Sequence, residues 1–312
     1  MEYICNDCPR RCGALRGDEL AGGFCASPSL PRVIRAAPHF GEEPCISGTR
    51  GAGTIFFTGC SLRCVFCQNH EISRGGGGRT LTEDALRDLM CRLRDRGVHN
   101  IELVTPSHFS RAIAKALDGL DLGIPVVWNS SGYESVESLR LLEGLVQVWL
   151  PDFKYADRAL AARYSAAPDY PEVALAAIGE MYRQAGPFQL DGEGLLRRGL
   201  LIRHLILPGA PENTLRVIDA VEDHLPVRNI LFSLMAQYTP MPGLARWPEL
   251  TRTVSPEEYA RCRSYLDFSE IENGYVQELE SAGTEAIPVF DGTGVGGNGI
   301  LKTEDLRLKN EK

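Results

Sequence analysis

Six short runs of β-branched, aromatic and aliphatic residues recur along the chain, separated by longer segments in which apolar residues return every three or four positions. The runs cover residues 53–58, 100–105, 124–128, 145–150, 199–207 and 229–235. Continuous apolar runs of this length predict buried strands, whereas the spacing between them predicts amphipathic helices. The alternation of the two indicates βαβ units and a parallel sheet with both faces covered.

Helix start signals support this alternation. Thr80 and Glu83 match a capping box, and Ser255 and Glu258 match a second one with a proline at the first helical position. Further helices are predicted over residues 107–118, around 139–142, within 156–186 and over 212–224. Because βαβ crossovers are right-handed, six such strands curl into an open partial barrel. We therefore predict an α/β fold, a partial (β/α)6 barrel.

Composition narrows the class of protein. The 312 residues can hold a barrel-like domain and an appendage, and the apolar and charged fractions, 44% and 24%, are ordinary for a globular protein. A net charge of −8 without a Lys/Arg block argues against non-specific nucleic-acid binding. No signal peptide and no membrane-spanning apolar run are recognisable, so we expect a cytoplasmic protein whose ten cysteines serve as thiolates or metal ligands.

Three of the cysteines lie on one short loop. Cys60, Cys64 and Cys67 have the spacing C-x3-C-x2-C and follow the strand over residues 53–58, at its carboxyl end, where α/β sheets bind their ligands. Iron–sulfur clusters are held by cysteine thiolates, and a four-iron cluster on three sulfurs leaves one iron open to a reactant. The alternatives are a zinc site completed by a fourth ligand such as His70 and, less in keeping with the spacing, a disulfide.

A second group of cysteines lies near the N-terminus, among glycines and prolines: Cys5, Cys8, Cys12 and Cys25. Because this segment is too small to pack a core of its own, a metal is the natural means of stabilising it. Four thiolates close a site, which fits an auxiliary iron–sulfur cluster or structural zinc, with unligated thiols as the alternative. Cys45 is either an extra ligand or a small buried residue, and Cys91 and Cys262, on predicted helices, are interpreted as structural.

Polar residues gather where the predicted strands end. They are Thr105, Ser107, His108, Asn129, Ser130, Ser131, Asp152, Lys154, Arg203 and His204. In a barrel, polar residues at the carboxyl ends of strands are typical of a catalytic or binding site. Each also has a structural interpretation: His108 could cap its helix, and Asp152 with Lys154 could form a rim salt bridge of little energetic value. Their recurrence at successive strand ends predicts a common site.

The cysteine loop, with Phe66 directly before its last cysteine, resembles the radical SAM superfamily. The resemblance implies a 4Fe-4S cluster whose open iron chelates S-adenosylmethionine (SAM) through its amino and carboxylate groups. It also implies reductive cleavage of SAM to methionine and a 5′-deoxyadenosyl radical that abstracts hydrogen, with Phe66 counted among the cofactor-binding residues.

Residues 49–235 are similar, more narrowly, to the glycyl-radical-enzyme activating enzymes of the pyruvate formate-lyase activase type. Asp152-Phe-Lys154 matches that family's Asp-x-Lys, Arg203 matches its carboxylate-binding arginine, and Asn129 stands where the family has an aspartate. The resemblance assigns these residues to SAM binding, and Thr105 is counted with them because of its position at a strand end. Two features depart from it. Residues 104–108 replace the usual Gly-Gly-Glu, and the N-terminal cysteines are typical of a less understood activase-like branch.

The resemblance implies a radical SAM oxidoreductase that receives its electron from a flavodoxin or ferredoxin, and a glycyl radical enzyme is one candidate partner. Modification of a small molecule or another peptide is the alternative, and a non-catalytic iron–sulfur or zinc protein for electron transfer or scaffolding is a third. The chain divides into a Cys-rich, metal-binding segment (1–48), the partial barrel (49–290) and a Gly-rich, charged tail expected to be mobile (291–312).

Overall fold

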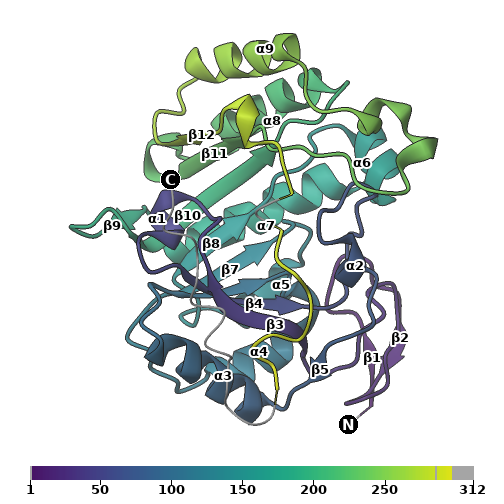
Figure 1. The fold of residues 1–312 in the computed structure, drawn as a ribbon, viewed down its shortest axis with the longest axis vertical. Coiled ribbons are helices and arrows are strands. Elements are labelled where there is room, and N and C mark those ends of the chain that lie inside the picture. Colours follow the sequence, from purple (N-terminus) through teal and green to yellow (C-terminus); the bar gives the residue numbers. More distant parts are fainter. Residues whose placement is uncertain (1, 285–286, 297–312) are drawn as a thin grey trace.

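The computed structural model describes residues 2–284 and 287–296 (Figure 1). Its centre is a curved sheet of parallel strands: β4 (Ala52–Phe57), β6 (Ile101–Val104), β7 (Val126–Ser130), β8 (Val148–Pro151), β10 (Leu196–Leu205), β11 (Leu231–Met235) and β12 (Gly274–Val276). Each strand pairs in parallel with the next in this order. The six predicted strands are confirmed, and β12 is an addition to them.

Alternation along the strands sorts their side chains between two faces. On β4, Ile55 and Phe57 belong to the large apolar cluster shared with the helices, whereas Phe56 belongs to a separate cluster with Val104. A third cluster, which contains Val127, lines the inner, concave face. Near the carboxyl ends of the strands, the side chains on the inner face are polar rather than apolar. The candidate site therefore lies at this end of the inner face.

Helices cover the outer face of the sheet (Figure 1). They are α3 (Glu83–Asp95), α4 (Ser110–Leu117), α5 (Val136–Arg140), α6 (Arg158–Ser165), α7 (Tyr170–Ala185), α8 (Pro211–His224) and α9 (Pro256–Asp267). Shorter elements are α2 (His70–Ser73), β9 (Gln189–Leu190) and 3-10 turns at Ser107–Phe109, Val227–Asn229, Leu244–Arg246, Pro248–Thr251 and Leu279–Ser281. None of the described helices combines the length and apolar character needed to cross a membrane.

The two predicted helix caps have different outcomes. The capping box of Ser255 and Glu258 is confirmed at the start of α9. The one at Thr80 is wrong, because Thr80 ends strand β5 (Arg79–Thr80) and Thr82 caps α3 by accepting from the backbone N–H of Ala85. Because Thr80 and Thr82 can each cap a helix, the sequence does not distinguish between two helix starts that are two residues apart.

The N-terminal region joins the sheet. Strands β1 (Tyr3–Cys5) and β2 (Ala14–Arg16) form a hairpin, and β3 (Arg32–His39) pairs antiparallel with β4 and β5. The sequence analysis predicts no strand at β3, because arginines and a proline interrupt its apolar pattern. The following helix, α1 (Pro44–Ser47), places Cys45 in the apolar cluster of the concave face. Its surroundings there favour the interpretation as a small buried residue.

Part of the predicted tail packs against this edge of the sheet. The backbone N–H of Ala36 donates to the carbonyl of Thr293 (2.9 Å), and Val295 is buried. Phe290 lies edge-on to Phe56, with ring centroids 5.5 Å apart. The tail is expected to be mobile from residue 291, and its described residues contact the sheet; residues 297–312 lie outside the described residues.

Replacing His204 with glutamine is expected to flatten the dependence of stability on pH. Its Nδ1 donates to the Phe153 carbonyl (2.6 Å) and its Nε2 accepts from the Thr214 hydroxyl (2.9 Å), a pattern that needs the neutral ring. Burial lowers the pKa of His204 to about 4. Below about pH 6.5 the unfolded chain alone takes up this proton, so folded stability falls by about 1.4 kcal/mol per pH unit as pH drops from about 6.5 toward 4. Urea denaturation of both proteins across this window measures the difference in slope, and equal slopes would contradict the assignment.

Candidate functional site

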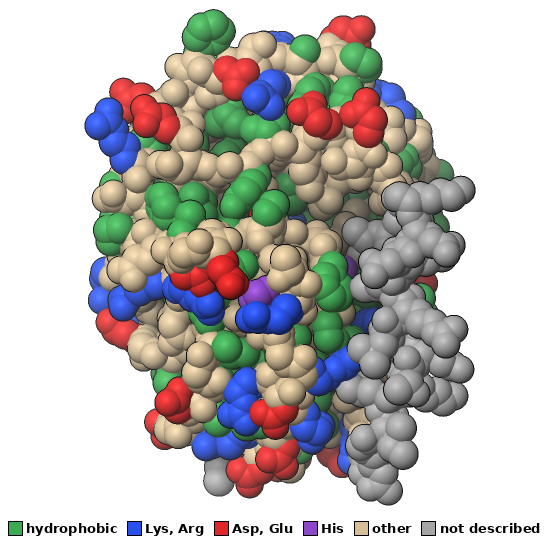
Figure 2. Space-filling view, turned by 60° about the vertical axis from the view of Figure 1, so that its left-hand side comes forward, with side chains coloured by type: hydrophobic (Ala, Val, Ile, Leu, Met, Phe, Trp, Pro, Cys, Tyr) green, Lys and Arg blue, Asp and Glu red, His purple; other side chains and the backbone are tan. Residues whose placement is uncertain are grey.

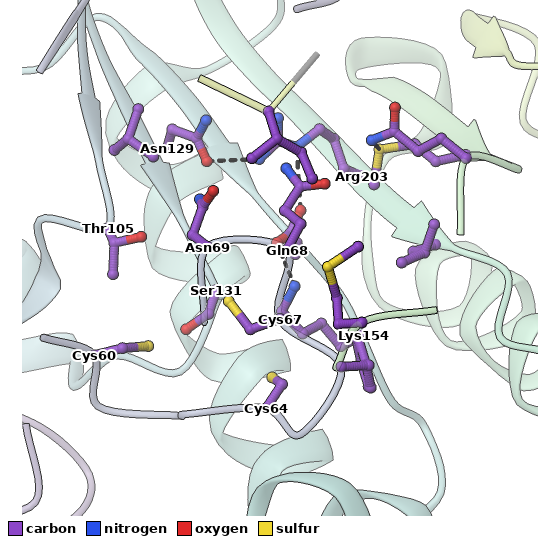
Figure 3. Close-up of a pocket in the computed structure, with 18 of the residues that line it drawn as sticks. Cys60, Cys64, Cys67, Gln68, Asn69, Thr105, Asn129, Ser131, Lys154 and Arg203 are labelled. Carbon is purple, nitrogen blue, oxygen red and sulfur yellow. Dashed lines mark hydrogen bonds and ion pairs between the residues drawn. The ribbon is translucent and has the colours of Figure 1, made fainter. Parts of the chain in front are cut away.

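Three thiols border one cavity at the carboxyl end of β4. The loop after the strand presents Cys60, Cys64 and Cys67 toward the same space, as Figure 3 shows. The Cys60 sulfur accepts from the backbone N–H groups of Leu62 (3.3 Å) and Arg63 (3.5 Å). Such donors stabilise a thiolate ligand, so the loop is suited to a metal cluster.

Aromatic packing also anchors the loop. Phe66 makes edge contacts with Tyr155, Tyr164 and Tyr238, at centroid distances of 6.4, 6.2 and 6.1 Å. Rings in this arrangement attract one another through their edges and faces. Phe66 also lines the cavity, so it both fixes the loop and forms part of the wall.

Opposite the thiols, charged groups from successive strands meet. Asp152 bridges two cations: its Oδ2 accepts from Lys154 Nζ (2.5 Å) and its Oδ1 from Arg203 Nε (3.1 Å). Burial alone would raise the pKa of Asp152, but the charges of Lys154 and Arg203 hold it below its ordinary value. Arg203 Nη2 also donates to Asn129 Oδ1 (2.6 Å). The sequence had placed these residues at strand ends, and the structure brings them together in one cavity.

Thr105 lines the same cavity in an unusual conformation. Its φ of +59° is in the left-handed region, which is unfavourable for a β-branched residue. Its backbone N–H donates to the carbonyl of Asn129 (2.9 Å), which holds the turn in place. Strain of this kind is concentrated at functional sites, so it agrees with the predicted role.

Two glutamates of this network were missed in the sequence. Glu42, in the loop between β3 and α1, accepts from Arg203 Nη1 (2.8 Å), and Glu102, on β6, accepts from Asn129 Nδ2 (2.6 Å). Burial, with the charge of Glu42 adding to it, raises the pKa of Glu102 well above its ordinary value and favours its neutral form. In the sequence, Glu102 is a lone acidic residue within an apolar strand, and this pattern could have indicated a functional role. Nothing local to Glu42 indicated the site.

The other strand-end residues divide into two groups. Ser130 and Ser131 line the cavity, whereas Ser107, His108 and His204 do not. His108 Nε2 contacts the carbonyl of Thr58 at 2.8 Å, and burial lowers its pKa to about 3, so it is a neutral residue with a structural role. Of the predicted strand-end residues, those that face the inside of the barrel therefore belong to the common site.

Further residues complete the cavity, and the sequence did not single them out. Gln68 and Asn69 follow the last cysteine of the loop (Figure 3), and Met235, Met241 and Ile287 also line the cavity. The cavity volume is about 170 Å³, and the cavity is open to solvent.

The N-terminal cysteines lie outside this cavity. Cys5 and Cys25 are buried, Cys8 is partly exposed and Cys12 is exposed, and all ten cysteines are free thiols. In the part of the chain that the structure describes, no three His, Cys, Asp or Glu side chains converge as they would around a single ion. Within the described residues, neither the loop cysteines nor the N-terminal cysteines form such a group, so this result does not distinguish the two sets.

A family model described as "Radical SAM superfamily" matches residues 54–184, which include the cysteine loop and Asp152 with Lys154. The chain belongs to the radical SAM superfamily. This membership confirms the first resemblance and the predicted fold, and implies an enzyme that uses a 4Fe-4S cluster and SAM.

This radical SAM protein is 30% identical over 264 residues to the uncharacterised protein MJ0674 of Methanocaldococcus jannaschii, covering 81% of the present chain and 71% of the relative. Among solved structures it is similar to SAM-bound SuiB of Streptococcus suis (14% identity, TM-score 0.49, 70% of this chain and 48% of SuiB). It is also similar to HydG, a maturase of the [FeFe]-hydrogenase (14% identity, TM-score 0.46, 69% and 49%). The chain thus spans about half the length of these two structures, and TM-scores below 0.5 carry no functional argument.

Proposed function

We propose that this protein cleaves SAM reductively at a 4Fe-4S cluster held by Cys60, Cys64 and Cys67. The observation that carries the proposal is the meeting of these thiols with Asp152 and Arg203 in one cavity. Bound there, the cluster supplies the electron that splits SAM into methionine and a 5′-deoxyadenosyl radical. The donor set fits such a cluster, because backbone N–H groups and the Ser165 hydroxyl, 3.1 Å from the Cys64 sulfur, already point at the sulfurs.

The task of the remaining residues is to bind and orient the cofactor. Lys154 and Arg203 offer cationic donors suited to the methionine carboxylate, and Arg203 adds the geometry of a planar fork. Asp152 holds both side chains in place, and Asn129 holds Arg203 from the other side. A cavity walled by Phe66 and other apolar residues excludes water from a reactive radical.

Anaerobic reconstitution with iron and sulfide, followed by addition of dithionite and SAM, tests the proposal. We expect iron at the loop cysteines and formation of 5′-deoxyadenosine, measured by liquid chromatography with mass detection. An intact cluster that neither binds SAM nor forms this product with a range of substrates would contradict it.

Replacing Glu42 with glutamine is expected to weaken SAM binding. The charged side chains that line the described cavity are two acids, Glu42 and Asp152, and two bases, Lys154 and Arg203. SAM carries a net charge of +1, because it has a sulfonium, an ammonium and a carboxylate. Removing one anion leaves an excess positive charge, which costs about 1–3 kcal/mol at several ångströms, or roughly 5–150-fold in Kd.

The matched ligand is S-adenosylhomocysteine, which lacks the sulfonium charge and has no net charge. We expect Glu42→Gln to weaken its binding less than that of SAM, and Glu137→Gln, an exposed change on α5, to alter neither. Equilibrium binding to the reconstituted proteins measures both constants. An equal loss for the two ligands would indicate a shape effect rather than an effect of charge.

The finer proposal is that the hydrogen donor is a backbone glycine of a partner protein, with a flavodoxin or ferredoxin as electron donor in a reducing cytoplasm. It is supported by the match of Asp152-Phe-Lys154 and Arg203 to the activase pattern. A glycyl radical signal in the electron paramagnetic resonance spectrum of a co-purifying partner, formed only with SAM and reductant, is the expected result. Turnover of a small molecule or an unrelated peptide without such a partner would favour the alternative.

A further inference from the structure

A buried arginine lies beside the N-terminal cysteines. Arg16, on β2, is 1% exposed, and its guanidinium donates to the backbone carbonyls of Ser27 (3.1 Å), Pro28 and His108 (3.0 Å). Its fourth acceptor is the sulfur of Cys5, 3.3 Å from Nη1. Within the described residues, this sulfur is the one acceptor of Arg16 that can carry a negative charge.

The charge of Arg16 favours a thiolate at Cys5, whose thiol otherwise donates to Asp7 Oδ2 (3.5 Å). A guanidinium is not deprotonated in a protein, and an isolated buried charge is costly unless a counter-charge accompanies it. Carbonyl dipoles provide part of the compensation, and a neutral thiol adds little. A metal bound by four thiolates has a net negative charge, which is what the buried cation requires.

The cysteines are carried on tight turns held in unfavourable conformations. In the turn from Cys8 to Cys12, the N–H of Arg11 donates to the carbonyl of Cys8 (3.0 Å) while Arg11 has a φ of +40°. Directly after Cys25, Ala26 has a φ of +51°. Residues with side chains persist in this region only where their surroundings over-determine them, and a shared metal centre would do so.

The two turns also approach each other. A side chain on Gly23 would place its Cβ 2.8 Å from the sulfur of Cys12, so only glycine allows the close approach of Cys12 to the turn that carries Cys25. In the hairpin, Cys5 of β1 pairs with Ala14 of β2, and Ala14 lies between Cys12 and Arg16 in the chain. The four cysteines therefore belong to one small structural unit.

We propose that Cys5, Cys8, Cys12 and Cys25 bind a second metal centre closed by four thiolates, either zinc or an iron–sulfur cluster. On binding, the thiols lose their protons to solvent, and the resulting anionic centre neutralises Arg16. With no open coordination position, the centre does not bind a substrate, and its contacts indicate which part of the protein it supports.

One side of the N-terminal unit contacts the loop that carries Cys60, Cys64 and Cys67. Arg10, between Cys8 and Cys12, donates to the carbonyls of Ser61 (2.8 Å) and Ser165 (2.7 Å). Ser61 follows Cys60 directly, and the Ser165 hydroxyl donates to the sulfur of Cys64 (3.1 Å). One side chain of the N-terminal unit thus holds both the loop and the residue that contacts one of its sulfurs.

The other side of the unit abuts the start of the loop. A Cβ on Gly59 would fall 2.5 Å from the carbonyl of Cys25, so the two backbones are in direct contact. The Ser27 hydroxyl donates to this carbonyl (3.0 Å). The second centre thereby fixes the loop of Cys60, an inference that rests on the proposed role of that loop as a cluster site.

The first experiment counts metal in full-length protein purified without oxygen, in which Cys60, Cys64 and Cys67 are replaced by alanine. Mass spectrometry of the elements is expected to find about one zinc, or about two to four iron atoms with sulfide, per chain. The Cys8→Ala/Cys12→Ala variant should lack this metal, and its difference from the wild type gives the same count independently. Neither metal at this level in either comparison, from protein folded by circular dichroism, would overturn the proposal.

The second experiment tests the link between the centres. Arg10→Ala should keep the N-terminal metal but release iron from the Cys60 loop to a chelator about tenfold faster, because charged hydrogen bonds to the loop are lost. Arg92→Ala, which changes an exposed arginine on α3, is the control and should match the wild type. Equal release from all three proteins would refute the link. Iron absent from the Cys60 loop of the wild type, with the N-terminal metal present, would instead refute the proposed function alone.

Discussion

Replacing Cys64 with alanine is expected to abolish the formation of 5′-deoxyadenosine. Only three thiols of the described chain border the cavity, so the variant would have two protein ligands for a four-iron cluster. Loss of a partner outside the ligand shell typically costs 10–100-fold, and we expect the loss of a ligand itself to exceed roughly 100-fold. Iron content and product formation, measured together after anaerobic reconstitution with SAM and dithionite, check this result.

Cys262→Ala is the matched control. Cys262 is fully buried where α9 packs on α8, and its sulfur lies 3.9 Å from the carbonyl of Pro211, away from the cavity. Its loss removes one buried sulfur and should cost about 1 kcal/mol of stability while leaving product formation unchanged. A Cys64→Ala protein that keeps its iron and its activity would show that the cluster lies elsewhere.

The sheet could be predicted wherever burial imposed a continuous apolar run. The strands β4 to β11 of the parallel sheet are covered by helices outside and by apolar or cofactor-site residues inside, so their sequences leave little ambiguity. Strands near the two ends of the sheet escape this constraint. β3 contains Arg32, Arg35 and Pro38, and β12 has only three residues, so neither had a recognisable pattern.

Alternation explains which of the strand-end residues belong to the site. Arg203 and His204 are neighbours on β10, and successive side chains of a strand point to opposite faces. Arg203 enters the cavity, whereas His204 contacts Thr214 of α8 on the outer side. Both residues were predicted to belong to the site, because a position at the end of a strand does not indicate the face of the sheet on which the side chain lies. Applying the two-residue period to each strand would have separated them.

Contacts between distant segments could not be predicted. Glu42 reaches Arg203, 161 residues away, because α1 enters the concave side of the sheet. Likewise, Arg10 reaches Ser61 and Ser165 only after the hairpin has packed on the barrel. No local spacing specifies such pairs. Their physical origin is the placement of one whole segment against another, which a single sequence does not encode as a motif.

Replacing Asp152 with asparagine is expected to be the most destabilising single change in the cavity. The side chains of Asp152, Lys154 and Arg203 are 15%, 19% and 12% exposed, so the two cations would lose their shared counter-charge at a largely buried position. Breaking a buried pair by removing one partner costs about 3–5 kcal/mol. Urea denaturation of cluster-free protein at pH 7 measures this loss. Asp267→Asn, which breaks the exposed pair with Arg263 on α9, is the control and should stay within about 0.5 kcal/mol of the wild type.

The effect of Asp152→Asn should also depend on pH in a defined direction. Because Lys154 and Arg203 overcome the effect of burial and lower the pKa of Asp152, the carboxylate stabilises the fold above its unfolded-state pKa, near about 3.9. That contribution is lost as the pH falls through the lower folded-state pKa. The stability gap between wild type and variant should therefore be constant from about pH 5 to 8 and shrink below about pH 4. A gap that persists unchanged into acid would mean that asparagine disrupts the packing of the cavity rather than its charge balance.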